Sequence, residues 1–240
     1  MRATQALAEA SSSLTKAYDA AGGLAALLDS CRRGLDVDAG GILVEVGGRL
    51  ELLASSSHQV SELETHQLDV DEGPCVESFQ TGDSVQDHAA DALLDRWPRF
   101  GGTMVAAGFA SVLASPLEIQ GRIFGAMGLF RRADAEFTSE EELVARAFAD
   151  IAAILTLQLG QIPEEQAAHR LQEALDARVL LEQAKGVLAG AHGLTMADAY
   201  ELLVQSAKDR HEPLTAWAVQ VIASAQTPRT SSRSTPDAPR

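Results

Sequence analysis

The segment Ala177–Gly190, ARVLLEQAKGVLAG, constrains the fold more than any other part of the chain. At a helical repeat of about 3.6 residues, Arg178 and Lys185 project from nearly the same face, and Glu182 can pair with either. The apolar residues of the segment follow the spacing of a buried stripe, at Leu181, Ala184 and Leu188. The pattern predicts an amphipathic helix with one packed side. By spacing alone, its charges form an ordinary solvated face.

The distribution of charge limits the kinds of partner. Residues 1–160 contain 24 acidic and 11 basic side chains, residues 161–224 contain 9 and 5, and residues 225–240 contain 1 and 3. An acidic surface repels phosphate backbones, which argues against non-specific nucleic-acid binding and against DNA as a partner. Lys185 and Lys208 nevertheless both fall in residues 161–224, and the chain has only one other lysine. A local basic face on an acidic body is therefore compatible with the sequence.

Neither a membrane nor an oxidising compartment is indicated. No apolar run approaches the ~20 residues that cross a bilayer, and Met1–Ala10 has no apolar block of the kind found in secretory signals. The two cysteines, Cys31 and Cys75, are expected to be reduced thiols. We therefore expect a cytoplasmic protein without a membrane partner.

The first two thirds of the chain alternate helical and extended patterns. Helices are expected over 6–20 and 24–35, and strands over 41–46 and 50–56 around a Gly47-Gly48 hairpin turn. A short helix over 75–81 closes at Gly82, strand candidates follow at 84–85, 109–117 and 122–130, and a long helix spans 139–158. That last helix repeats apolar residues every 3.5 positions, which fits packing on its own sheet or a helix pair between two chains. These elements predict an α+β fold in which helices flank the sheet.

Three further helices are expected after Pro163, where we place a domain boundary. One begins near Glu164, a second begins at the capping-box-like Thr195-x-x-Asp198, and a third has Pro213 in its first turn. Three short helices with polar turns would form a compact bundle. The predicted domains are thus 1–160 and 161–224, followed by a Pro-, Ser-, Thr- and Arg-rich tail over 225–240 that we expect to be disordered.

Residues of about 5–160 resemble a GAF domain, a small-molecule sensing fold. The motifs that carry this resemblance are EGPC (72–75), Thr81-Gly82, WPRF (97–100) and GFASVLASPL (108–117). The resemblance implies an α/β sandwich with an antiparallel sheet and a ligand under loops such as 93–107. Pocket candidates are Cys75, Phe79, Trp97 and Phe100, although core packing is the better explanation for each of them. Bilin attachment at Cys75 is not favoured.

The histidines of this region show no metal-ligand spacing. His58, His66 and His88 fall in segments that look like loops, where surface histidines are common. We expect no metal and no cofactor. The sequence is compatible with a small-molecule effector of the GAF-like domain but does not identify one.

Arg178-x-x-Leu181-Glu182-Gln183-Ala184-Lys185-Gly186-x-Leu188 and the two helices after it resemble the ANTAR family of transcription antitermination domains. The resemblance implies recognition of paired hexaloop stem-loops in nascent RNA, and we expect a homodimer. It assigns Arg178 and Lys185 to phosphate or loop contacts and Gln183 to a base edge. Gly186 would allow close approach of the RNA, and Lys208 and Arg210 would add charge near the same region.

Three features qualify this assignment. Gln183 points about 140° away from Arg178 around the helix, so a flat face cannot present both. Val204 and His211 stand where the family often has Arg and Asn. The acidity of residues 1–160 also suggests that the GAF-like domain masks the RNA face at rest.

Two alternatives belong to other functional classes. The chain could be a thiol-based reductase with Cys75 as nucleophile and Cys31 as resolving partner, although neither thiol has an activating Lys or His beside it. It could also be a signalling module whose helical end binds protein and has no RNA activity. The family resemblance favours a regulator over an enzyme.

Overall fold

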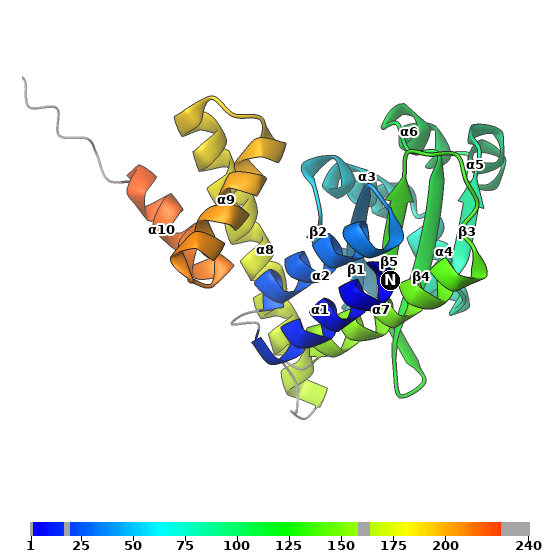
Figure 1. The fold of residues 1–240 in the computed structure, drawn as a ribbon, viewed down its shortest axis with the longest axis horizontal. Coiled ribbons are helices and arrows are strands. Elements are labelled where there is room, and N and C mark those ends of the chain that lie inside the picture. Colours follow the sequence, from blue (N-terminus) through cyan, green and yellow to red (C-terminus); the bar gives the residue numbers. More distant parts are fainter. Residues whose placement is uncertain (1, 17–19, 158–163, 227–240) are drawn as a thin grey trace, which may run out of the picture.

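The structure, a computed structural model, describes residues 2–16, 20–157 and 164–226. An α/β part extends through α7, and a helical part, α8–α10, lies beside it (Figure 1). Among the described residues, no helix is both long and apolar enough to cross a membrane.

A five-stranded antiparallel sheet in the order β2-β1-β5-β4-β3 forms the centre of the α/β part. Its strands are β1 (Ala39–Val46), β2 (Arg49–Ser55), β3 (Val85–His88), β4 (Ser111–Ile119) and β5 (Arg122–Arg131). The predicted hairpin turn is confirmed, with φ of 58° at Gly47 and 83° at Gly48. These left-handed values suit glycine and match the twist of the paired strands. The antiparallel sheet expected from the sequence is therefore present.

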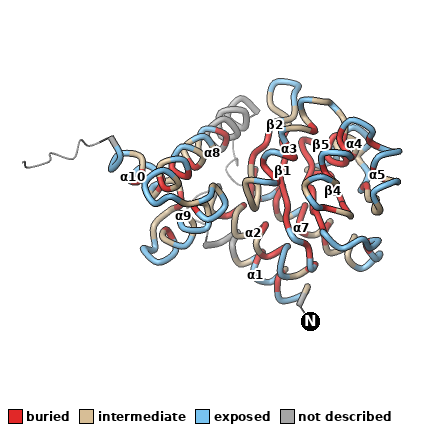
Figure 2. The backbone as a smooth tube through the Cα atoms, turned by 90° about the horizontal axis from the view of Figure 1, so that it is seen from above, coloured by how far each residue is buried: buried red, intermediate tan, exposed pale blue. Residues whose placement is uncertain are grey.

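One face of the sheet is covered by α1 (Arg2–Lys16), α2 (Ala20–Leu35) and α7 (Ser139–Leu157). Side chains alternate across each strand, so Ile42, Leu113 and Met127 point into this layer, where they pack with Phe148 of α7. The apolar repeat of α7 therefore packs on the chain's own sheet and N-terminal helices. Figure 2 shows the buried strands between the two helical layers.

The other face is covered by helices that the sequence only partly indicates: α3 (His58–Val70), α4 (Pro74–Thr81), α5 (Ala90–Arg96) and α6 (Gly101–Ala106). The α4 helix ends at Gly82 in the left-handed conformation, as predicted. The loop assignment of residues 93–107 is wrong, since much of it is helical. The loop assignment of the histidines is also wrong, because His58 and His66 lie on α3 and His88 ends β3.

The helical part comprises α8 (Glu164–His192), α9 (Met196–Arg210) and α10 (Leu214–Gln226). Thr195 caps α9 as expected, accepting a hydrogen bond from the Asp198 backbone N–H. The first helix is not short, since α8 has 29 residues. The α10 helix extends two residues past the predicted domain end. The predicted boundary near Pro163 and the rest of the predicted tail, 227–240, lie outside the described residues.

Candidate functional site

The bundle of α8, α9 and α10 is held together by the stripe predicted for α8. Leu181, Ala184 and Leu188 are buried against residues of the other two helices, namely Ala199, Leu203, Ala207, Leu214, Ala218 and Val221. These contacts fix the rotation of α8 about its axis. They therefore determine which polar side chains of α8 face solvent and which do not.

Lys185 lies inside the bundle rather than on its surface. Only 2% of the residue is exposed, and its Nζ lies 2.9 Å from both carboxylate oxygens of Glu182. The ammonium also lies 5.4 Å from the ring centroid of Tyr200 on α9. Ion pairing compensates for burial of the charge, which would otherwise be costly. In this arrangement Lys185 joins α8 to α9, and RNA has no direct access to its ammonium.

Tyr200 connects this pair to the α/β part. Burial, reinforced by the carboxylates of Glu182 and of Asp29 on α2, raises the pKa of Tyr200 to about 12. Local sequence spacing does not indicate that Tyr200 lies over Lys185 or faces a residue of α2.

Arg178 is directed at the α/β part. Its guanidinium donates to Ser61 Oγ of α3 over 3.5 Å, and the residue is half-buried. One turn earlier on the same helix, Leu175 belongs to the core formed by α1, α2, α7 and the sheet. The predicted RNA face at Arg178 and Lys185 is thus occupied by contacts within the chain.

The remaining predicted RNA residues are exposed. Gln183 and Gly186 lie on the open side of α8, and a Cβ atom built on Gly186 would meet no atom within 4 Å. Crowding between helices therefore does not account for this glycine. Arg210 lies at the end of α9 with its guanidinium carbon 3.9 Å from the ring centroid of Trp217. This cation–π contact fixes the direction of an exposed charge.

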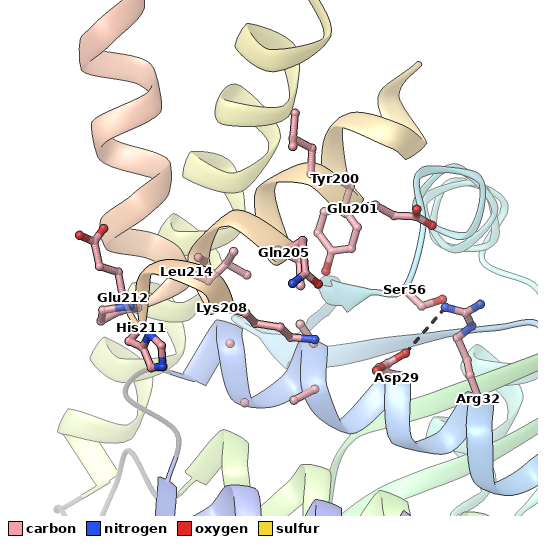
Figure 3. A pocket seen from close by; sticks show the side chains of 18 of the residues that line it. Asp29, Arg32, Ser56, Tyr200, Glu201, Gln205, Lys208, His211, Glu212 and Leu214 are labelled. Atoms are coloured by element: carbon pink, nitrogen blue, oxygen red, sulfur yellow. Dashed lines mark ion pairs between the residues drawn. The ribbon is translucent and has the colours of Figure 1, made fainter. Parts of the chain in front are cut away.

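A groove of about 1040 Å³ separates α9 from α2 (Figure 3). Asp29, Arg32 and Ser56 line it from the α/β part, while Tyr200 and Lys208 line it from the bundle. Lys208 is exposed within it. The groove therefore places one predicted RNA contact opposite the acidic α/β part.

The pocket candidates of the α/β part lie on the α3–α6 side of the sheet. Cys75, Trp97 and Phe100 are buried in the core, and Phe79 is half-buried beside it. The Trp97 indole N–H donates to Glu77 over 2.9 Å, and a hydrogen bond from Arg96 to the same carboxylate lowers the pKa of Glu77. Packing thus accounts for all four side chains, and their predicted role in ligand binding stays a prediction.

A buried polar cluster that the sequence analysis did not identify lies in the same layer. Glu64 of α3 accepts a hydrogen bond from Gln67 and lies 3.7 Å from the Cys75 thiol. Burial raises the pKa of Glu64 to about 8, and also raises that of Cys75. Cβ atoms at Gly41 and Gly128 would come within 2.5 and 2.9 Å of the Glu64 carboxylate, so these glycines make room for it on the sheet.

The thiol-reductase alternative is contradicted by the positions of the cysteines. Cys31 is buried with α1, α2 and α7, whereas Cys75 is buried on the opposite face of the sheet. A resolving thiol must reach the sulfur that it attacks, and the sheet separates these two. Among the described residues, no group of three or more His, Cys, Asp or Glu side chains is placed to hold a metal ion.

Comparison with known families assigns both parts of the chain. A GAF domain model matches residues 23–155, and an ANTAR domain model matches residues 169–222. A comparison with curated proteins gives no match.

Solved structures support the fold of the first part. The GAF domain of an Acinetobacter phosphoenolpyruvate-protein phosphotransferase has a TM-score of 0.53 at 14% identity, covering 66% of this chain and 95% of its own. The GAF domain of the Coxiella burnetii phosphoenolpyruvate-protein phosphotransferase has a TM-score of 0.52 at 19% identity, with the same coverage, 66% and 95%. At such identities the likeness establishes the fold alone.

The matched regions coincide with the two parts of the structure. The GAF match ends within α7, and the ANTAR match covers most of α8–α10. A GAF domain is a sensor domain, and an ANTAR domain implies RNA-binding antitermination regulation; both are regulatory domains, not catalytic ones. The chain therefore belongs to the GAF domain family and carries an ANTAR domain after its GAF domain, in a GAF–ANTAR architecture.

Proposed function

We propose that the protein is a signal-responsive transcription antitermination regulator that recognises paired hexaloop stem-loops in nascent RNA. The observation that carries the proposal is the ANTAR match, which spans all six residues of the predicted RNA site. Control passes from the GAF domain to the bundle through α8, the helix that contacts both. The effector is a small molecule or a protein partner of the GAF domain.

The exposed residues of the bundle provide the first contacts with RNA. Gln183 and Gly186 offer a side-chain amide and an open backbone surface on α8, and Arg210 offers an oriented guanidinium at the end of α9. Unstacked loop bases are read by such groups along their edges, while a few cations bind the stem phosphates. The exposed Lys208 adds a cation at the end of α9, Arg178 joins the site once it leaves its contact with Ser61, and Lys185 supports the site from within the bundle.

We further propose that the protein acts as a cytoplasmic homodimer. Paired stem-loops present two copies of one target, and two linked bundles would gain affinity through effective concentration. Sedimentation equilibrium of the full chain with the paired-loop RNA is expected to give a complex of two chains and one RNA. A complex of one chain on a paired RNA would contradict the dimer without affecting RNA recognition.

The function is tested by titrating the full chain with an RNA that carries two adjacent hexaloop stem-loops, against a loop-scrambled RNA of the same length. Gln183→Ala is the informative variant because the side chain is exposed, so its loss leaves the bundle core intact. We expect loop-dependent binding that this substitution weakens about tenfold, corresponding to one or two lost hydrogen bonds.

Gln80→Ala serves as the matched control, since Gln80 is exposed on α4 of the GAF domain. Equal binding of the intact and scrambled RNAs by the wild-type chain would contradict RNA recognition of this kind. In that case, a protein-binding signalling module would become the better account.

A further inference from the structure

We propose that the groove between α2 and α9 binds a free α-amino acid with an aliphatic side chain, held as its zwitterion. The α2 helix covers the opposite face of the sheet from the pocket candidates of the GAF domain, so this is a separate site. The inference does not depend on RNA recognition. It rests on the polar groups that the two walls of the groove present to each other.

The α9 wall of the groove carries two polar groups that have no partner among the described residues. The Lys208 ammonium forms no ion pair there, and the Tyr200 hydroxyl forms no hydrogen bond. Figure 3 shows both side chains extending from α9 toward α2. Lys208 is exposed and Tyr200 is half-buried. An ammonium and a hydroxyl that share one groove are hydrogen-bond donors suited to a carboxylate.

Asp29 provides the opposite charge on the α2 wall. Its carboxylate lines the groove and contributes to the raised pKa of Tyr200, although the two side chains make no hydrogen bond. The groove between them can therefore admit a polar group of a ligand. Glu201 lines the same groove from α9. Two carboxylates in one groove are acceptors suited to an ammonium.

Neither a simple anion nor a simple cation would use both walls. An anion paired with Lys208 would be repelled by Asp29 and Glu201. A cation paired with Asp29 would be repelled by Lys208 and by Arg32, whose guanidinium nitrogen lies 4.0 Å from an Asp29 oxygen. A ligand with a carboxylate and an ammonium close together meets an opposite charge on each side. A free amino acid has this arrangement.

The lining between the charged groups is apolar and made of small residues. It consists of Ala25 and Ala26 on α2 and of Val204 and Ala207 on α9. An aliphatic side chain that packs on this lining leaves water, which favours binding. The volume of about 1040 Å³ is at the upper end of the range for small-molecule sites, so an amino acid can enter without displacing any part of the chain.

The test is isothermal titration calorimetry of the full chain with L-leucine and with two analogues that each lack one charge. The analogue 4-methylpentanoate has the same carbon skeleton without the amine, and 3-methylbutylamine has it without the carboxylate. We expect a Kd of about 1 mM or tighter for L-leucine. Each analogue should bind about tenfold more weakly or worse, because it forfeits the hydrogen bonds of one charged group.

Tyr200→Phe is the most specific variant. Its hydroxyl has no hydrogen-bond partner in the part of the chain that the structure describes, so its removal costs the fold no such bond. We expect it to weaken L-leucine binding about 2–10-fold at an unchanged temperature of thermal unfolding. Asp29→Asn and Lys208→Gln should each weaken binding about tenfold or more. Asp95→Asn is the matched control, since Asp95 is exposed on α5, and it should bind L-leucine as the wild type does.

Three results would overturn the inference. The first is that neither L-leucine nor L-valine, L-isoleucine or L-methionine binds at about 10 mM. The second is that either analogue binds as tightly as L-leucine, since one wall of the groove would then suffice. The third is that L-leucine binding persists in Tyr200→Phe, Asp29→Asn and Lys208→Gln, which would place the amino acid elsewhere in the protein. A separate titration measures loop-dependent RNA binding, so a failure of this site and a failure of the proposed function are distinguishable.

Discussion

Lys185 and Glu182, three residues apart on α8, form an ion pair in which both carboxylate oxygens lie 2.9 Å from the ammonium nitrogen. The lysine is buried, but the carboxylate side chain is 36% exposed. In the sequence, Lys185 resembles a residue that contacts RNA. In the structure, its ion pair with Glu182 holds the ammonium beneath the ring of Tyr200. The ion pair orients α8 relative to α9. We therefore expect a substitution of Lys185 to affect RNA binding through this orientation and not through a direct contact.

Lys185→Ala is expected to lower the free energy of unfolding of the chain by about 1–3 kcal/mol, because a buried, hydrogen-bonded charge and its contact with Tyr200 are lost. Urea denaturation measures this change. Lys208→Ala is the control, since Lys208 is exposed, and it should stay within about 0.5 kcal/mol of wild type. Equal stability of the two variants would mean that the pair contributes nothing to the fold. A loss of RNA binding in Lys185→Ala should accordingly be interpreted together with its stability.

Glu64 gives the GAF domain a pH-dependent stability. Because burial raises its pKa in the folded state from an ordinary value of 4.5 to about 8, the folded state holds a proton that the unfolded state has released. This contribution to stability is fully present below about pH 4.5 and is lost as the pH rises toward 8. We expect the wild-type free energy of unfolding to fall across this window, at up to about 1.4 kcal/mol per pH unit.

Glu64→Gln removes the titration while keeping a side chain of the same shape, so its pH profile between 5 and 8 should be flatter than that of the wild type. Glu62→Gln on the exposed side of the same helix should retain the wild-type slope. Chemical denaturation at several pH values measures all three proteins. Identical slopes for Glu64→Gln and wild type would show that Glu64 is ionised in the folded state.

Neither thiol is expected to react in the folded protein. Cys31 and Cys75 are both fully buried, and burial raises the pKa of each thiol, so the thiolate that reacts with alkylating agents is scarce. Iodoacetamide labelling followed by mass spectrometry should leave both cysteines unmodified in the native chain and label both in denaturant. Rapid, selective labelling of Cys75 in the native chain would contradict the buried geometry and restore interest in thiol chemistry.

The elements that carry a simple local pattern are predictable from the sequence. The Gly47-Gly48 hairpin, the Thr195 cap and the α8 stripe each depend on a few neighbouring residues, and each is confirmed. The α3 helix was missed for a physical reason. Its buried side includes Glu64 and Gln67 as well as Val60 and Leu63. Because polar residues occupy buried positions, the sequence does not show the apolar stripe of an amphipathic helix. The Ser57 cap, whose hydroxyl accepts from the Val60 N–H, was the available signal.

The candidate RNA site was harder to predict because it depends on how two parts of the chain meet. Spacing placed Arg178 and Lys185 on one face of α8, but nothing local indicates that Ser61 and Asp29 face that side of the bundle. Helical geometry alone predicts that the side chains of Gln183 and Arg178 point in different directions around α8. In the structure, Gln183 lies on the exposed side and Arg178 faces α3.

Substitutions of Arg210 and Trp217 can distinguish the contribution of the Arg210 charge to RNA binding from the contribution of its fixed orientation. The guanidinium of Arg210 is exposed and stacks on the indole at 3.9 Å, so it is an oriented cation. If it contacts a phosphate, Arg210→Gln should weaken binding of the paired-hexaloop RNA and reduce the slope of log K against log salt concentration by about 0.7–0.9.

Trp217→Leu keeps the charge but removes its stacking partner, so we expect weaker binding with an unchanged salt slope. Arg99→Gln, an exposed arginine in the GAF domain, controls for general charge and should alter neither quantity. Titrations at four salt concentrations measure the slopes, and thermal unfolding checks that each variant is folded. If Arg210→Gln changed affinity without changing the slope, Arg210 would contact a base and not a phosphate, since only phosphate contacts release condensed counterions. If it changed neither, the end of α9 would lie outside the RNA site, and recognition would be confined to α8.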